Sequence, residues 1–182
     1  MHTQTCSTQR TELPDTDRAF FYVDGIPTKG IWLDIDDVDS WADVHDALHA
    51  AGLTDADYGG DVLVADIEGP LARAAYSSRL DMLDLTAYLE LRNDVERNGF
   101  SSAAVVAFIN WYGSWDADAF ESAYMGCYDS EEVFADRYIM DTGMLSEVPG
   151  HLVCYFDLER FARDLFMCDY YFDDGYVFCS NC

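Results

Sequence analysis

The sequence predicts an α+β protein built from three small segments that follow one another along the chain. Short aromatic and β-branched runs lie near both ends, helical periodicity fills the middle, and an Asp-Gly pair separates two aromatic runs close to the C-terminus. We expect a disordered lead-in at residues 1–18, a small sheet plus helix at 19–68, a helical middle domain at 69–113, and a C-terminal α+β domain at 114–182.

The segment at 19–68 reads as strands around one helix. Residues 19–24 and 30–35 form two aromatic and β-branched runs with glycine and proline between them, and residues 61–67 form a third. Ser40 is placed to cap a helix whose apolar residues recur every three or four positions. Gly52 is placed to end that helix.

The segment at 69–113 is helical in pattern. Leucines from Leu80 to Leu91 predict one amphipathic helix that stops near Gly99. Ser101 or Ser102 caps a second helix, which ends before Gly113. We therefore expect a helical segment with these two helices.

The segment at 114–182 mixes both types. Helices are predicted over residues 116–125 and after Asp129 and Asp157, and Asp81 and Asp116 are also expected at helix starts as caps. Residues 169–172 and 176–179 flank an Asp-Gly pair, which indicates a β-hairpin.

Negative charge is spread along the whole chain. There are 35 acidic residues against 10 basic ones, for a net charge of -25, and the nets of residues 1–60, 61–120 and 121–182 are -9, -6 and -10. Such a chain repels nucleic acid and anionic membranes and attracts cationic surfaces. Adaptation to high salt is an alternative explanation of the acidity. No signal peptide and no apolar run of membrane-spanning length is present, so a cytoplasmic location is expected.

Motifs for metal or nucleophilic chemistry are weak, and no cofactor is predicted. The acidic cluster Asp34–Asp39 could hold Ca²⁺ or Mg²⁺ but does not fit the EF-hand pattern. Cys179 and Cys182 form a lone C-x-x-C, which with His151 and Cys154 could complete a zinc site. Without a secretion signal, the six cysteines are expected to be reduced thiols.

The segment Met144–Asp157 (MLSEVPGHLVCYFD) resembles the antirestriction motif of the ArdA family of DNA mimics. Residues 123–135 and 155–165 resemble two further stretches of that family, and residues 30–34 and 66–69 resemble its N-terminal part. The resemblance covers residues 19–179 and is most specific in the last third of the chain.

The resemblance implies three small units in an elongated, curved arrangement and a head-to-head homodimer formed around residues 144–157. It implies a bacterial protein of mobile genetic elements, without enzymatic activity, that binds type I restriction–modification enzymes in the channel meant for DNA. The charge agrees with this expectation. B-DNA carries one charge per roughly 1.7 Å of axis, so two chains of this acidity match about 85 Å of duplex.

Two groups of residues are the candidate sites. The expected DNA-mimicking surface consists of the carboxylates of Asp34, Asp36, Asp37, Asp39, Asp81, Asp84, Glu90, Asp94, Asp116, Asp118, Glu121, Glu131, Glu132 and Asp136. The expected dimer contact and antirestriction motif comprise Leu145, Val148, Pro149, Tyr155, Phe156 and Asp157, although some of these could instead pack the C-terminal core. Two rival functions remain: a metal-dependent enzyme or Ca/Mg binder using Asp34–Asp39, and a generic acidic chaperone for basic proteins.

Overall fold

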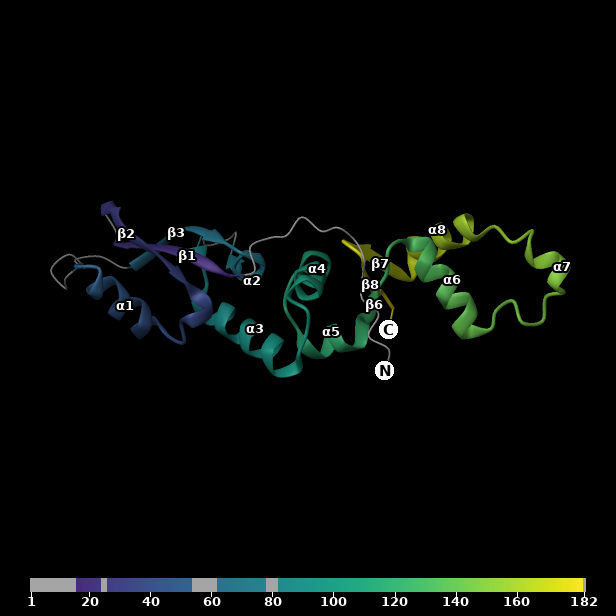
Figure 1. The fold of residues 1–182 in the computed structure, drawn as a ribbon, viewed down its shortest axis with the longest axis horizontal. Coiled ribbons are helices and arrows are strands. Elements are labelled where there is room, and N and C mark those ends of the chain that lie inside the picture. The colour runs from purple at the N-terminus through teal and green to yellow at the C-terminus, as the bar shows by residue number, and fades with distance from the viewer. Residues whose placement is uncertain (1–15, 24–25, 54–61, 78–81, 182) are drawn as a thin grey trace. The chain divides into compact units, whose positions relative to one another are not determined.

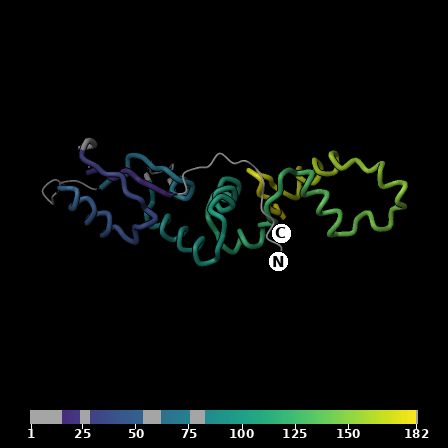
Figure 2. The backbone as a smooth tube through the Cα atoms, viewed as in Figure 1, coloured from purple at the N-terminus to yellow at the C-terminus, as the bar shows by residue number. Residues whose placement is uncertain are grey.

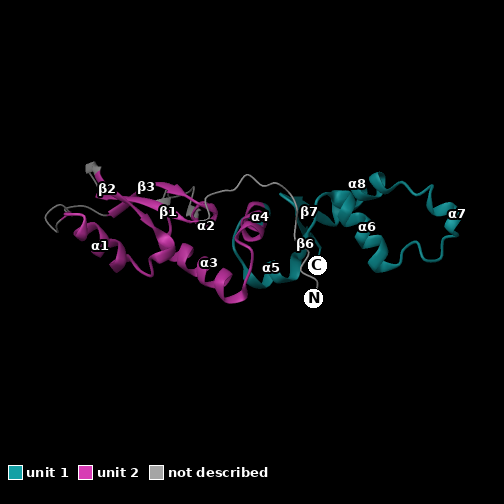
Figure 3. Cartoon of the chain, in the orientation of Figure 1, with its two compact units in different colours: residues 1–10, 111–182 teal, residues 11–110 magenta. Residues whose placement is uncertain are grey.

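The computed structural model describes residues 16–23, 26–53, 62–77 and 82–181, and the chain divides into two compact units (Figure 3). We name residues 11–110 the N-terminal unit and residues 111–182 the C-terminal unit. Each is described by itself. The finer division into three segments stays a prediction.

The N-terminal unit is built around a three-stranded antiparallel sheet with strand order β2-β1-β3 (Figure 1). In chain order its elements are β1 (Arg18–Val23), β2 (Ile26–Asp34), the 3-10 helix η1 (Ile35–Asp37), α1 (Trp41–Ala50), β3 (Val62–Glu68), α2 (Pro70–Ala74), β4 (Tyr76–Ser77), β5 (Met82–Leu83), α3 (Leu85–Asn98) and most of α4 (Ser102–Tyr112).

Alternation along β1 gives the sheet one buried face. Ala19, Phe21 and Val23 are fully buried, while the residues between them are half-buried. Phe21 meets Trp41 of α1 edge to face, with ring centroids 6.0 Å apart, so α1 packs on this face. Buried side chains of the unit also come from the helices, among them Tyr88 of α3 and Phe108 of α4.

The C-terminal unit contains α5 (Ala117–Ala123), β6 (Tyr124–Cys127), α6 (Glu131–Thr142), α7 (Gly150–Val153), α8 (Leu158–Cys168), β7 (Tyr170–Asp173) and β8 (Tyr176–Cys179). Its antiparallel sheet has the order β6-β8-β7, and all four residues of β8 are buried. Phe134 of α6, Leu165 of α8 and Val177 of β8 form the core between the helices and the sheet. The path of the backbone through these elements can be followed in Figure 2.

The α+β class is confirmed, with two three-stranded antiparallel sheets and helices beside them. The predicted hairpin is also confirmed. Asp174 and Gly175 join β7 to β8, and both have positive φ, 44° and 86°, as a two-residue type I′ turn requires.

The middle helix was predicted to begin too early. Leu83 lies in β5, and α3 begins only at Leu85, because the Asp84 carboxylate accepts a hydrogen bond from the backbone N–H of Ala87 at 3.1 Å and caps the helix there. The predicted cap at Asp81 and the residue Leu80 lie outside the described residues. Short β4 and β5, and α2, were not predicted.

Three further expectations need correction. Residues 124–127 form β6 instead of ending a helix, because they pair with β8 and Gly126 has φ +120°. Ser130, rather than Asp129, caps α6. Strand β1 begins at Arg18, and Asp17 before it is buried, so these two residues belong to the fold rather than to the lead-in.

The expectation of reduced thiols is wrong for one of the described cysteines. Cys179 is disulfide-bonded, whereas Cys127, Cys154 and Cys168 are not. Within the described parts of the chain, the helices are too short or too polar to cross a bilayer.

Candidate functional site

Most of the predicted carboxylates lie at the surface. Eleven of the fourteen are exposed, Asp94 and Glu131 are half-buried, and Asp81 lies outside the described residues. The exposed ones come from both units, on η1, on the helices α3, α5 and α6, and on the turns before them. The structure thus places negative charge at many separate points and not in one cluster.

Some of these carboxylates stabilise local structure. Asp116 caps α5 through the N–H of Ala119 at 2.9 Å, as Asp84 caps α3. Asp157, from the motif, caps α8 through the N–H of Arg160 at 3.0 Å. Such a cap contributes about 1 kcal/mol to stability.

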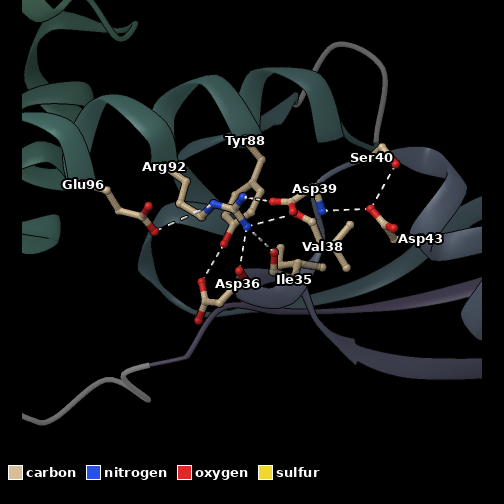
Figure 4. A network of polar contacts seen from close by, with 9 residues as sticks. All are labelled: Ile35, Asp36, Val38, Asp39, Ser40, Asp43, Tyr88, Arg92 and Glu96. Atoms are coloured by element: carbon tan, nitrogen blue, oxygen red, sulfur yellow. Dashed lines mark hydrogen bonds and ion pairs between the residues drawn. The ribbon is translucent and has the colours of Figure 1, made fainter.

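The cluster Asp34–Asp39 is held in place by a buried arginine of α3 (Figure 4). Arg92 Nη1 donates hydrogen bonds to the carbonyls of Ile35, Asp36 and Val38, at 3.1, 2.7 and 2.9 Å. Its Nη2 lies 2.8 Å from Asp39 Oδ1. Arg92 therefore holds the backbone of the segment that carries these acids. Its own side chain is buried, with only 9% of its surface exposed.

Two acids near this network, Asp36 and Asp17, accept hydrogen bonds from within the chain. Tyr88 donates its hydroxyl to Asp36 Oδ1 at 2.8 Å, and the backbone N–H of Asp17 donates to Asp36 Oδ2 at 3.1 Å. The Asp17 carboxylate accepts from the N–H of Ala72. Burial, with the nearby charge of Asp36, raises the pKa of Asp17, and burial raises the pKa of Tyr88 far above its usual range.

Other predicted carboxylates are exposed and take part in no ion pair of the described chain. In the part of the chain that the structure describes, no ion pair involves Asp37, Glu90, Asp118, Glu121 or Asp136. All five are exposed. These residues are the best candidates for direct contact with a cationic partner.

The arginines contribute little free positive charge. Among the described residues, ion pairs join carboxylates to five arginines, namely Arg18, Arg92, Arg97, Arg137 and Arg163. The last two pairs are i,i+4 contacts along α6 and α8. Pairing within the chain leaves the excess of acids to set the field around the protein.

The segment 143–157, which links α6 to α8 and contains α7, exposes apolar side chains. Tyr155 is 81% exposed, and Met144, Leu152 and Val153 are exposed as well, as is Met140 in the preceding helix α6. Of the predicted contact residues, Pro149 is exposed, while Leu145, Val148 and Phe156 are half-buried. The Phe156 ring lies 5.5 Å, centroid to centroid, from that of Phe161, which packs against the core of the unit.

Sequence reasoning did not identify Arg92, Asp17 or the exposed methionines. A signal for Arg92 was present, because it occupies the same helical stripe as Tyr88 and Val95, where an apolar residue is usual. For Asp17 no local signal exists, since its burial depends on α2, far along the chain.

A metal centre at Asp34–Asp39 finds no support in the geometry. Asp34 pairs with Arg18, Asp36 accepts from Tyr88, and Asp39 pairs with Arg92. Among the described residues, no three His, Cys, Asp or Glu side chains gather as a metal site would require.

Together, the fold and the site define a small acidic α+β protein whose exposed carboxylates and apolar segment suit contacts with another macromolecule. The family model of the antirestriction protein ArdA matches residues 22–178, which include the segment 144–157. The chain therefore belongs to the ArdA antirestriction family, and this membership implies antirestriction, with a restriction–modification enzyme as the kind of partner. A search of curated proteins gave no significant match.

Proposed function

We propose that this protein is a DNA mimic that occupies the DNA-binding site of type I restriction–modification enzymes and so blocks restriction. The observation that carries the proposal is the spread of exposed carboxylates over both units, with the described arginines largely paired within the chain. A single cluster of carboxylates would suit one cation, whereas carboxylates spread over both units suit a channel that is lined by many cationic side chains.

The physical basis is the way such enzymes hold DNA. Half to two-thirds of protein–DNA hydrogen bonds go to phosphate and sugar, and Lys and Arg supply much of the affinity. Carboxylates such as Asp118 and Glu121 can meet the same side chains. They offer no base to read and no phosphodiester bond to cut, so the enzyme is occupied without turnover.

A homodimer is part of the proposal. The exposed apolar residues of segment 143–157, above all Tyr155, are suited to meet a second copy of the chain across a two-fold axis. Pairing two chains would double the length of the acidic array. It would also place both copies of the family's motif at the contact.

Competition for DNA tests this function. A labelled duplex carrying the recognition site is bound to a purified type I methyltransferase core, and the protein is titrated in. We expect full displacement of the duplex, weakening as salt rises, because the contacts are ionic. A histone-like basic protein serves as the comparison. If the protein binds the methyltransferase core and the histone-like protein equally well and does not displace the duplex, a general acidic chaperone is supported instead.

A further inference from the structure

The outer face of the N-terminal sheet, opposite α1, combines aromatic rings with acids. In the antiparallel register Phe20 lies opposite Trp32, and Arg18 lies opposite both Asp34 and Glu68. Residues opposite each other share a face. This outer sheet face therefore carries Arg18, Phe20, Tyr22, Trp32, Asp34, Asp66 and Glu68.

An arginine is already bound on this face. The guanidinium carbon of Arg18 lies 5.6 Å from the centroid of the Trp32 ring, and its Nε lies 2.7 Å from Asp34 Oδ1. Its Nη1 lies 4.0 Å from Glu68 Oε2. The Nε contact is an ion pair whose angle falls outside hydrogen-bond geometry, so Arg18 is held by charge and by the ring rather than by a fixed fork.

The aromatic platform is itself fixed. Phe20 and Trp32 pack with centroids 5.7 Å apart. The Phe20 ring also covers Gly30, where an added Cβ would stand 2.7 Å from the ring. The Trp32 face is thus positioned by its neighbours and does not depend on Arg18.

The face remains negative and reachable with Arg18 in place. It holds three carboxylates, Asp34, Asp66 and Glu68, against one guanidinium. The side chains of Arg18, Asp34 and Glu68 are 41%, 54% and 48% exposed. A cation from a partner therefore meets an attractive field, and it must displace the Arg18 guanidinium to reach the Trp32 ring.

We propose that the outer sheet face binds an arginine side chain of the restriction enzyme, which takes the place of Arg18 over Trp32 and between Asp34 and Glu68. The inference rests on the proposed function for the identity of the partner. Arginine fits better than lysine, because its planar guanidinium stacks on a ring while pairing with carboxylates. Arg18 then acts as an internal competitor.

The test uses the full chain and two synthetic peptides, hexa-arginine and hexalysine. The indole N–H signals of the tryptophans are followed by NMR, with Trp32→Phe identifying the Trp32 signal. We expect hexa-arginine to shift the Trp32 signal more than hexalysine does at equal concentration. Equal shifts from the two peptides, or a Trp32 signal that does not move, would overturn the proposal.

Removal of the internal competitor gives the second arm. Arg18→Gln is expected to tighten hexa-arginine binding about threefold, since one cation–π contact and its ion pairs become available to the peptide. Arg97→Gln is the matched control, because it removes the same charge from an exposed Arg97–Asp94 pair without a ring. An equal gain in hexa-arginine affinity in both variants would mean that the effect comes from net charge alone, and it would refute the proposed arginine-binding site.

The two proposals fail separately. The peptide measurements need no restriction enzyme, so a peptide-binding face with no displacement of DNA would refute the proposed function alone. If Arg18→Gln leaves the displacement of DNA unchanged, and the Trp32 signal responds equally to hexa-arginine and hexalysine, only the proposed arginine-binding site is refuted.

Discussion

At the scale of the residue, one buried arginine organises an acidic segment. Arg92 donates hydrogen bonds to three backbone carbonyls of the segment 35–38, and of these the Ile35 carbonyl also accepts from the backbone N–H of Val38. Its charge is balanced by Asp39, and Glu96 lies 3.9 Å from Nε. The acids at 34–39 are thus supported from a helix more than fifty residues away in sequence.

Replacing Arg92 by methionine should cost about 3 kcal/mol of unfolding free energy, because buried acceptors lose their donor. Urea unfolding followed by circular dichroism measures this. Arg97→Gln, in an exposed pair on the same helix, should cost less than about 1 kcal/mol. Equal losses in the two variants would contradict the role assigned to Arg92.

Asp17 should give a pH-dependent stability difference. Burial raises its pKa in the folded state, so the folded form disfavours the ionised carboxylate. The resulting cost is absent below the ordinary value of 3.8 and develops as pH rises through the raised folded pKa. Asp17→Asn removes that cost. The unfolding free energy of Asp17→Asn minus that of the native chain should therefore increase as pH rises from about 3 to about 7. A difference that does not change with pH would contradict the raised pKa of Asp17.

At the scale of the element, the segment 143–157 is distinctive because several of its apolar side chains, above all Tyr155, are exposed while its ends are anchored. Gly143 closes α6 with φ +64°, and Asp157 opens α8. The helices on either side are fixed by the core of Phe134, Ala162 and Leu165. An exposed apolar segment between two fixed helices suits a subunit contact.

Tyr155→Glu should therefore convert the proposed dimer into a folded monomer, as measured by sedimentation velocity. Placing a charge in a desolvated contact costs several kcal/mol, whereas Tyr155 makes little contact within its own chain. Met167→Glu is the control, because Met167 is 73% exposed on α8 and lies outside the segment. A dimer that survives Tyr155→Glu, or that both changes disrupt, would refute this contact.

At the scale of the whole molecule, function should depend on the array and on no single acid. Each exposed charge pair contributes about 1 kcal/mol or less, and the net charge of -25 mainly speeds the encounter. This redundancy distinguishes a mimic from an enzyme, in which one substitution can abolish activity.

Single changes such as Asp118→Asn should weaken DNA displacement by about twofold at most. The triple change of Asp118, Glu121 and Asp136 to their amides should weaken it by about tenfold, and less at high salt. The displacement assay described above measures both. If one single carboxylate-to-amide variant is folded but no longer inhibits, the proposal of a DNA mimic is contradicted.

The sequence by itself determined the class of fold, the acidity, the C-terminal hairpin and the family. These follow from local rules: alternation, helical spacing, the Asp-Gly turn at 174–175, and short motifs such as 144–157. Tertiary structure alone decided that Asp17 is buried, that Leu83 lies in a strand, that Arg92 holds the segment 35–39, and that Arg18 sits over Trp32. Each of these depends on partners distant in sequence, and burial and pairing between distant residues leave no local pattern to read.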